Sequence, residues 1–577
     1  MKAHDRDRNR SAPRRLLYSR SLVIHDHWTL AEAPPDNPRI PIANATLRSL
    51  MIRRGVTDGE SFRRFVAPAM TDLHDPSTIH GMDHACERIA RAVRDGEGIV
   101  IYGDYDVDGV TSIVMLQSVL RSLGADVGFV VPHRLVDGYG LKMEVLDRVL
   151  SERNVKLVIT VDCGITSVEP VNRAIERGID VIITDHHLPP GFLPEAAAVL
   201  NPTQPGCSYP FKDLAGVGVA FKLCCELIRR AGKKTSIESL MKIAAIGTVA
   251  DVAPLIGENR TITSLGLAGL ADVRNPGLRA LLKRLGLAGR ALRAVDVGFK
   301  IGPRIKAAGR LASANTAIDL FSAPDEDAAW EICSELDRMN VERQQIEIQV
   351  RESAEAQISG GERILILAGE GWHRGVLGLT AGRIAQRYQR PTLVMTIEGD
   401  LCVGSGRSIP TVDLHSELDA VHELFTHFGG HEFACGFSFE AKNLGALRQR
   451  LHERFARFDE TVFRREAHVD ASLTLAEIDA EFIATHEMLQ PFGAGNTQPL
   501  FVIRDVTVTG TRTFAEDCCE LTLQDATGRG VGVLWPSAKE LRSQMNGAPM
   551  DMLVKVEPDK YSVARLEVVD VRPSPSS

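Results

Sequence analysis

Four short motifs of acidic residues and histidines each close or follow a hydrophobic run of the chain. They are GDYDVDG at Gly103 to Gly109, VDCG at Val161 to Gly164, TDHH at Thr184 to His187 and TVAD at Thr248 to Asp251. Carboxylates and imidazoles that meet at several strand or helix ends can form one oxygen-rich cage for hard divalent cations. Such a cage serves hydrolysis at phosphorus, so the motifs indicate a metal-dependent phosphoesterase.

The first motif carries three carboxylates, Asp104, Asp106 and Asp108, between two glycines that permit a tight turn. If the backbone stays extended, alternation places the three on one side, where they repel one another unless a cation neutralises them. The alternative is a solvated acidic loop like a calcium site. The glutamate that ends an EF-hand loop is missing, however, because residue 115 is Met115. The motif therefore favours metal binding.

The second and third motifs supply Asp162, His186 and His187 after two further strand-like runs. On its own, a histidine at a strand end is more often a capping or core residue than a ligand. The case for metal binding by the two histidines is stronger beside Asp162, because one bridging carboxylate can hold two cations ~3.5 to 4 Å apart. Cys163 is not expected to be a ligand, since oxygen-dominated sites favour manganese or magnesium over thiolate metals.

The motifs must be positioned by strands and helices, which the sequence predicts through an alternation of β-rich runs and helical periodicity. From Gly98 the chain reads GIVIYG, VTSIVMLQSVLRSLG, VGFVVP, MEVLDRVLSERN and VKLVITVD, which is the alternation of a βαβ fold. We therefore expect an α/β domain with a mainly parallel sheet, whose ligands gather at the carboxyl ends of the strands. Asp251 is expected differently, at the end of the helical run SIESLMKIAAIGTVAD and before the helix breaker Pro254.

Three further regions follow this domain. A polar helical stretch of about 35 residues after Ala323 is long enough to span ~50 Å and predicts a connecting helix. A second α/β unit comes next, and its motifs SGRS at Ser405 to Ser408 and FGGH at Phe428 to His431 are expected in loops. From about Thr461, short β-runs separated by turn signals predict a small barrel, an OB-fold.

The composition limits the partners and the compartment. At 577 residues the chain holds about three or four domains. Its net charge of -8 and pI near 6.1 exclude a generally polyanion-coating surface, so nucleic acid would need a local groove. Ten cysteines without a CxxC pair fit reduced thiols. No apolar run of signal-peptide or membrane length follows the arginine-rich N-terminus, which is either a solvated tail or a nucleic-acid arm, so a cytoplasmic protein is expected.

The four motifs in this order resemble the DHH phosphoesterase superfamily, named for the triplet found here as Asp185, His186 and His187. The chain is most similar to its bacterial single-strand-specific exonucleases, through VPHRLVDGYGL, GPRIKAAGRL, GSGRSIP, FGGH and PFGAGN. The resemblance implies two divalent cations, Mn²⁺ or Mg²⁺. It also implies six catalytic residues, of which all but His187 bind metal: Asp106, Asp108, Asp162, His186, His187 and Asp251. His187 would lie beside the scissile phosphate, with Asp104 nearby.

The same resemblance implies a set of substrate-binding residues: Arg134, Tyr139, Arg304, Arg310, Ser405, Arg407 and His431. Those of SGRS and FGGH, with Arg310, would hold a 5′ phosphate, while Arg134 and Tyr139 would guide the strand. Arginine suits bidentate phosphate contacts, and the glycines of FGGH let backbone amides approach an anion. Each residue also has a structural alternative, as a surface arginine, a turn or a buried core tyrosine. The chain departs from the family at Lys306, where asparagine is usual.

We therefore predict an exonuclease that degrades single-stranded DNA from 5′ to 3′ and releases 5′ mononucleotides by two-metal hydrolysis, in DNA repair and recombination. Two alternatives remain, a DHH hydrolase of short oligonucleotides or cyclic dinucleotides and a non-enzymatic single-strand-binding scaffold. The long helix and the barrel argue against the first, and the complete set of acids argues against the second. A single-strand-binding protein and a helicase are further expected partners. Association with a membrane is not expected.

The predicted fold is α/β, with a parallel-sheet DHH catalytic domain, a long connecting helix, a second α/β DHH-associated domain and a C-terminal OB-like β-barrel. The expected boundaries are a lead-in over 1–80, the catalytic domain over 81–322, the connecting helix over 323–359, the DHH-associated domain over 360–460 and the OB-like domain over 461–577.

Overall fold

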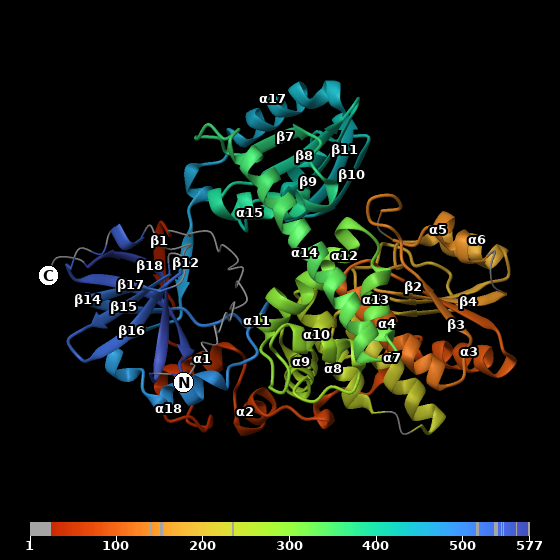
Figure 1. Cartoon of the computed structure of the whole chain (residues 1–577), viewed down its shortest axis with the longest axis horizontal. Coiled ribbons are helices and arrows are strands. Elements are labelled where there is room, and N and C mark those ends of the chain that lie inside the picture. Colours follow the sequence, from red (N-terminus) through yellow and green to blue (C-terminus); the bar gives the residue numbers. More distant parts are fainter. Residues whose placement is uncertain are drawn as a thin grey trace, which may run out of the picture.

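The computed structural model describes residues 25–138, 140–150, 154–233, 236–514, 518–535, 541–543, 545, 547–560 and 562–574. Figure 1 shows three lobes: a barrel (blue, left), an α/β unit (green to cyan, top) and a larger α/β lobe (orange to green, right). Each lobe contains its own sheet, and a long helix leads from the larger α/β lobe into the upper one. The predicted fold class is confirmed.

The larger lobe is built on a five-stranded sheet in the order β3-β2-β4-β5-β6, in which every pair of neighbours is parallel. The strands are β2 (Gly98–Gly103), β3 (Val127–Val130), β4 (Val155–Val161), β5 (Asp180–Thr184) and β6 (Ala198–Leu200). The central strands are apolar almost throughout, because helices cover both faces of the sheet. All strands therefore end at one edge, where the predicted ligands follow β2, β4 and β5.

Helices surround this sheet and extend the same core. They are α3 (Met82–Asp95), α4 (Val107–Ser122), α5 (Met143–Leu150), α6 (Val168–Glu176), α7 (Gly216–Ala231), α8 (Ile237–Ala250), α9 (Gly257–Gly269), α10 (Pro276–Arg284), α12 (Gly302–Leu311) and α13 (Asn315–Ser322). Helix α4 is buried on nearly every side, with α7 and α8 packed against it. The start of α4 is therefore held firmly at the carboxyl edge of the sheet.

The predicted connecting helix is α14 (Glu326–Glu355), whose 30 residues span ~45 Å. Its first half shares the core of the large lobe through Ala329 and Leu336, and its second half shares the core of the upper lobe through Val350 and Ala354. It is shorter at both ends than the predicted stretch because the Asp325 side chain caps its first turn and irregular chain follows Gln357. The helix is thus a rigid link between two cores.

The upper lobe has a mixed sheet in the order β10-β11-β9-β8-β7. Its elements are β7 (Leu365–Glu370), α15 (Arg374–Tyr388), β8 (Thr392–Glu398), β9 (Leu401–Arg407), α16 (Leu414–Asp419), β10 (His427–His431), β11 (Ala434–Glu440) and α17 (Leu444–Phe455). Strands β7 and β8 are parallel, and the remaining neighbours are antiparallel. Helix α15 packs on β8 and β9.

The prediction that SGRS and FGGH lie in loops is wrong. Ser405 to Arg407 end β9, and Phe428 to His431 lie in β10. The glycines suggested turns, but in this sheet they are needed because neighbouring groups leave no space for a side chain. A Cβ at Gly404 would lie 2.4 Å from the ring of Phe437, and one at Gly430 would lie 2.2 Å from the carbonyl oxygen of Ala434.

The third lobe is a closed barrel of five strands, in which β14 pairs with β15 and β17, and β18 joins β16 to β17. Its elements are β13 (Ala471–Leu473), α18 (Ala480–Glu487), β14 (Phe501–Phe514), β15 (Cys518–Gln524), β16 (Arg529–Leu534), β17 (Met550–Pro558) and β18 (Ala564–Pro573). The predicted OB-like barrel is confirmed. Across the described ranges, every helix is too short or too polar to cross a bilayer.

The first described residues belong with this barrel. Strand β1 (His27–Leu30) pairs in parallel with β12 (Glu466–Val469). Helix α1 (Ala45–Arg53) contributes Leu47, Leu50 and Met51 to the core that the barrel strands form. Figure 1 shows this red segment against the blue barrel, so the two ends of the described chain meet in one lobe.

The barrel lobe is anchored to the larger α/β lobe by Arg260 of α9. Its guanidinium donates to the carbonyl oxygens of Phe65, Met488, Leu489 and Gln490, and it lies 3.6 Å above the ring of Phe65. Burial lowers the pKa of Arg260 to about 9. These hydrogen bonds stabilise the junction because they link α9 to carbonyls of the barrel lobe, and a hydrogen bond from a charged donor contributes more than a neutral one.

A second contact joins the barrel lobe to the loop that follows α8. The Leu255 amide donates to the carbonyl of Ala494 at 2.7 Å, within the segment PFGAGN. A Cβ at Gly493 would lie 2.6 Å from Leu255, and one at Gly495 would lie 3.1 Å from Pro254. The two glycines therefore allow the PFGAGN segment to brace this loop.

Candidate active site

The turn from β2 into α4 brings the first three carboxylates together. Asp106 is the N-cap of α4, and its Oδ1 accepts the amides of Asp108 at 2.8 Å and Gly109 at 3.2 Å. The backbone does not stay extended through the motif, because Asp108 already lies in the first helical turn. The acids converge through the strand-to-helix turn instead. Gly109 permits it, since a Cβ there would lie 2.3 Å from the carbonyl oxygen of Asp104.

Asp108 lies against the first residues of α7. The sequence did not indicate this contact. Its two carboxylate oxygens accept the amides of Gly216 at 2.8 Å and Val217 at 2.6 Å. The amides at a helix start favour a negative charge. The side chain is completely buried, which fixes its orientation relative to the cage.

Asp162 follows β4 in a left-handed conformation, with a φ of 60°. Aspartate tolerates this region better than most residues, and a non-glycine residue held there points to a functional site. Its carboxylate lies against the start of α7, because a Cβ at Gly216 would lie 2.6 Å from its Oδ1. Glycine at 216 therefore makes room for the candidate ligand.

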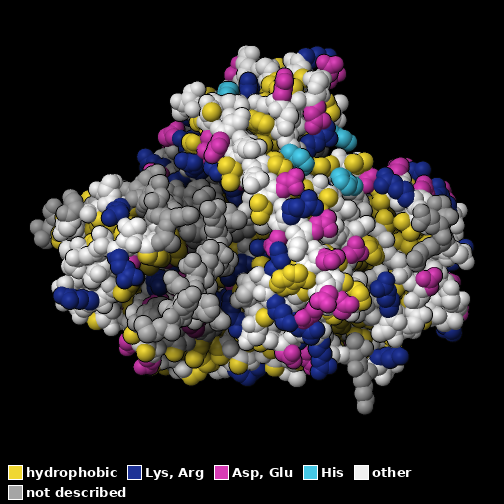
Figure 2. Space-filling view, viewed as in Figure 1, with side chains coloured by type: hydrophobic (Ala, Val, Ile, Leu, Met, Phe, Trp, Pro, Cys, Tyr) yellow, Lys and Arg dark blue, Asp and Glu magenta, His cyan; other side chains and the backbone are white. Residues whose placement is uncertain are grey.

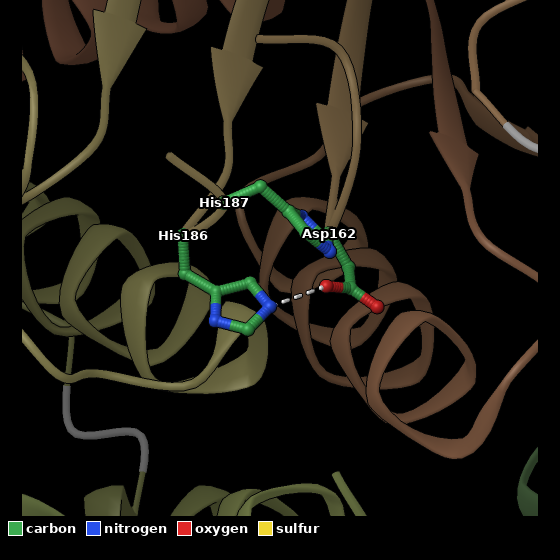
Figure 3. A group of neighbouring side chains, drawn as sticks. All are labelled: Asp162, His186 and His187. Atoms are coloured by element: carbon green, nitrogen blue, oxygen red, sulfur yellow. Dashed lines mark ion pairs between the residues drawn. The ribbon is translucent and has the colours of Figure 1, made fainter. Parts of the chain in front are cut away.

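The histidine pair follows β5 and faces Asp162 (Figure 3). Nε2 of His186 lies 3.2 Å from Oδ1 of Asp162, and the rings of His186 and His187 lie 4.5 Å apart. Buried Asp185 supports both residues, since its Oδ1 accepts their amides at 2.8 and 3.1 Å. Asn201, at the end of β6, donates to the carbonyl of His187 at 2.8 Å. Sequence reasoning missed these supporting roles of Asp185 and Asn201.

All six predicted catalytic residues are brought together. Together with Asp104, their ligand atoms fall into three overlapping groups, each within 4.8 Å: Asp162 with His186 and His187, Asp108 with His186 and Asp251, and Asp104 with Asp106 and Asp162. The groups share His186 and Asp162, so they form one continuous cage. Asp251 joins it from the C-cap of α8, as the helical pattern predicted.

The charges of the cage favour bound cations. Burial, and then repulsion by Asp106, raises the pKa of Asp104 to about 7. Burial, and then repulsion among the acids, also raises the pKa of Asp108 and of Asp162 well above the ordinary value. Among the described residues, Oδ1 of Asp104 has no hydrogen-bond donor although it is buried. Buried carboxylates with a neutral imidazole form the ligand set that Mn²⁺ or Mg²⁺ takes, so the residues fit these metals.

Lys306 is the cation next to this cage. Its Nζ donates to the carbonyl of Ala250 at 2.6 Å, at the end of α8. Burial lowers the pKa of Lys306, while attraction by Asp106 acts against this shift. One ammonium cannot balance the carboxylates of the cage, so it supplements the divalent cations rather than replacing them.

A cluster of arginines adjoins the cage. Arg134 lies 4.8 Å above the ring of Tyr105, which stands between two acids of the cage motif. Arg310 of α12 donates to the carbonyl of Gly375 at 2.9 Å. Burial, followed by repulsion from the neighbouring arginines, lowers the pKa of Arg310 to about 9. In the described part of the chain, neither arginine lies within 4.0 Å of a carboxylate, and the same holds for Arg407. The cluster, with Arg407, therefore has the charge to bind an anion from outside the protein.

Residues of the upper sheet extend this anion site. Nη1 of Arg407 donates to Oγ of Ser405 at 2.8 Å. In the β9-β11-β10 register Arg407, Ala434 and His431 lie side by side, with their side chains on one face. His431 is thus two strands, or about 10 Å, from Arg407, across the small residue Ala434. His431 itself is exposed.

Arg304, a predicted substrate residue, is not brought to this cluster. Arg304 is held by Asp337 of α14, with Nε 2.5 Å from Oδ1, and faces the connecting helix. Tyr139 lies outside the described residues. Arg343 of α14, which sequence reasoning missed, contributes to the field around Arg310 and donates to Asn340 at 2.7 Å. Its spacing on a polar helix gave no signal, because exposed arginines are common on such helices.

Comparison with known proteins connects these features to a family. Residues 98–248 match the model of the DHH family, N-terminal domain, residues 361–457 match the DHHA1 domain, and residues 469–566 match the RecJ OB domain. Most residues of the cage lie in the first range. The sheet face that carries Ser405, Arg407 and His431 lies in the second. Each of the three lobes contains one of these matches.

Two similar proteins and one similar solved structure are described as RecJ. The single-stranded-DNA-specific exonuclease RecJ of Salmonella typhimurium is 35% identical over 499 residues, 82% of this chain and 84% of that protein. The RecJ of Bacillus subtilis is 38% identical over 470 residues, 80% of this chain, and the chain spans 59% of that relative's length. The crystal structure of RecJ in complex with Mn²⁺ from Thermus thermophilus is similar with a TM-score of 0.82 and 27% identity, covering 95% of this chain and 80% of that one.

Proposed function

Because the chain belongs to the RecJ family of single-stranded-DNA-specific exonucleases, we propose that it hydrolyses single-stranded DNA from the 5′ end and releases 5′ mononucleotides. The observation that carries this proposal is the position of the arginine cluster directly beside the acidic cage, with Arg134 on Tyr105 between them. A terminal phosphate held by the cluster would place the next phosphodiester near the cage. This geometry favours removal of one terminal nucleotide at a time.

The cage residues would hold two divalent cations, Mn²⁺ or Mg²⁺. The proposed ligands are Asp106, Asp108, Asp162, His186 and Asp251, with Asp104 beside them. When bound, the cations lower the pKa of water and stabilise charge on phosphate oxygens. The protein's part is to hold its carboxylates in place through the starts of α4 and α7.

His187 is the proposed proton-transfer group. Burial alone would lower its pKa, but its hydrogen bond with Asp185 raises the pKa above the ordinary 6.5. A protonated imidazole beside the scissile phosphate can neutralise the leaving 3′ oxygen. The side chain is 37% exposed, so a substrate can reach it.

The 5′ phosphate is assigned to the arginine cluster and its neighbours. Arg310 and Arg407 offer bidentate contacts, Ser405 offers a hydroxyl, and Arg134 and His431 lie on the path of the strand. Tyr139 stays a proposed guide of the strand, and Arg304 is proposed to act only through α12. The predicted domain boundaries likewise stay proposals.

The barrel is proposed to bind the strand beyond the cage. Some of its charges are paired, since Lys555 lies opposite Glu567, and Arg565 lies opposite Glu557 and 2.9 Å from Asp559. On the face in Figure 2, basic and acidic side chains are interspersed over the described residues, so affinity would come from a local groove. A single-strand-binding protein and a helicase are proposed protein partners, and co-purification with each would test them.

Digestion of end-labelled strands tests the function. We expect a 5′-labelled single strand to lose its label as mononucleotide in Mn²⁺, while a 3′-labelled strand shortens progressively. Duplex of the same sequence should resist, and EDTA should stop the reaction. Release of label from the 3′ end first, or equal digestion of duplex, would contradict the proposal. The alternative of a short-oligonucleotide hydrolase predicts activity on dinucleotides and none on a long strand.

A further inference from the structure

Val252, which follows Asp251, has a left-handed backbone with a φ of 66°. The amides of Val252 and Ala253 donate to the carbonyls of Val249 and Thr248, each at 3.3 Å. This pair of bonds closes a helix in the way that usually places glycine at the left-handed position. A β-branched side chain there is strained, because its Cβ crowds the backbone.

Burial of the side chain does not offset this strain. Val252 is 66% exposed, although the residues that follow it are fixed. Ala253 and Leu255 are buried, and the Leu255 amide is held by the carbonyl of Ala494 at 2.7 Å. The isopropyl group is therefore held rigidly at the surface, at a position where glycine would be less strained.

The strained residue lies at the rim of the cage. Asp251, directly before it, shares a group of candidate ligands with Asp108 and His186. Non-glycine residues with positive φ are rare in the described ranges, and another of them is Asp162, inside the same cage. Backbone strain without a packing benefit at such a place indicates a functional contact.

We propose that Val252 contacts the substrate, with its isopropyl group against the apolar sugar and base surface of the nucleotide at the cage. An aliphatic side chain cannot exchange a hydrogen bond, so its partner is apolar surface. A nucleotide offers such surface on the C–H groups of its deoxyribose and on the face of its base. This inference rests on the proposed function, because its ligand is a single strand of DNA.

Replacement by glycine separates this role from a structural one, because two measurements move in opposite directions. Val252→Gly relieves the strain, so the melting temperature should stay the same or rise by about 2 °C. The same change removes the contact, so kcat/KM on a 5′-phosphorylated single strand in Mn²⁺ should fall about tenfold. Mn²⁺ binding without DNA, measured by calorimetry, should be unchanged.

Gln389→Gly is the matched control. Gln389 also has a left-handed backbone, with a φ of 51°, but it ends α15 away from the cage. This variant should keep the wild-type rate. Wild-type kcat/KM for Val252→Gly would overturn the inference, as would loss of Mn²⁺ binding or a melting temperature that falls with the activity. A wild-type chain that releases no nucleotides would instead contradict the proposed function, and the wild-type reaction reports this separately.

Discussion

Asp185 holds His187 in place, with its Oδ1 2.7 Å from Nδ1 of the imidazole. The other carboxylate oxygen accepts the amide of Ile165 at 2.9 Å, so the buried acid is fixed from both sides. Burial alone would raise the pKa of Asp185, but its hydrogen bond with His187 lowers the pKa below the ordinary value. The orientation of the His187 ring therefore depends on a residue outside the proposed ligand set.

Asp185→Asn should therefore impair catalysis without emptying the cage. The amide cannot stabilise an imidazolium, so the pKa of His187 should fall and kcat should drop about 10- to 100-fold. The pH profile of kcat and Mn²⁺ binding by calorimetry are the measurements. Asp180→Asn, at the other end of β5, is the control. An unchanged pH profile would contradict the role of Asp185.

Asp108→Ala and Asp162→Ala test the cage itself. Each removes a carboxylate that belongs to a candidate ligand group, so Mn²⁺ binding and nearly all hydrolysis should be lost. Binding of single strands, measured by fluorescence anisotropy, should persist through the arginine cluster. If either variant kept more than about a tenth of the wild-type turnover, a loss of only ~1.4 kcal/mol, its assignment as a ligand would be wrong.

Stability without metal should depend on pH in a direction set by the buried acids. The pKa of Asp104 in the folded protein is about 7, against an ordinary 3.8. Between these values the folded state binds a proton that the unfolded state has released, so the free energy of unfolding falls as the pH rises from about 4 to 7. Melting curves in EDTA should show this fall, and Mn²⁺ should reverse it because ligands bind deprotonated. Asp104→Asn should flatten the slope in EDTA, and an unchanged slope would count against the raised pKa.

Arg407→Ala tests the anion site. Losing a charge-assisted contact costs ~1.5 to 3 kcal/mol, so use of a 5′-phosphorylated strand should weaken about tenfold or more. The preference for a 5′ phosphate over a 5′ hydroxyl should shrink in parallel. Arg450→Ala removes an arginine paired with Glu423 in the same lobe and should leave the preference intact. An equal preference in wild type and Arg407→Ala would sink the assignment.

Arg260→Ala tests the lobe junction. The change leaves several carbonyls without their donor and removes the stacking on Phe65, so unfolding should become easier by ~3 kcal/mol. Limited proteolysis should cut the chain between lobes earlier than in wild type. Arg64→Ala, an exposed arginine paired with Glu60, should change neither measurement. Equal proteolysis of Arg260→Ala and wild type would show that other contacts hold the lobes.

Local sequence patterns predicted the elements and the cage because strand ends and helix ends carry the ligands. Asp162 and His186 follow apolar runs that could only be buried strands, and parallel strands end at one edge. The supports of the ligands could not be predicted, since the amide of Gly216 meets Asp108 across 108 residues of chain. The strands holding SGRS and FGGH were missed for a related reason, because the residue that makes Gly430 necessary lies on the partner strand.

The two ends of the described chain meet in the barrel lobe, and this imposes a delay on its folding during synthesis. Arg53 donates to the carbonyl of Asp470, a partner 417 residues later in the chain. At about 5 to 20 residues per second, the ribosome needs roughly 20 to 80 s to make that partner. The apolar face of α1, with Leu47 and Leu50, is therefore synthesised roughly 20 to 80 s before the strands that cover it. A product terminated early would keep this face bare, so we expect nonsense truncations in the barrel to aggregate through their N-terminal end.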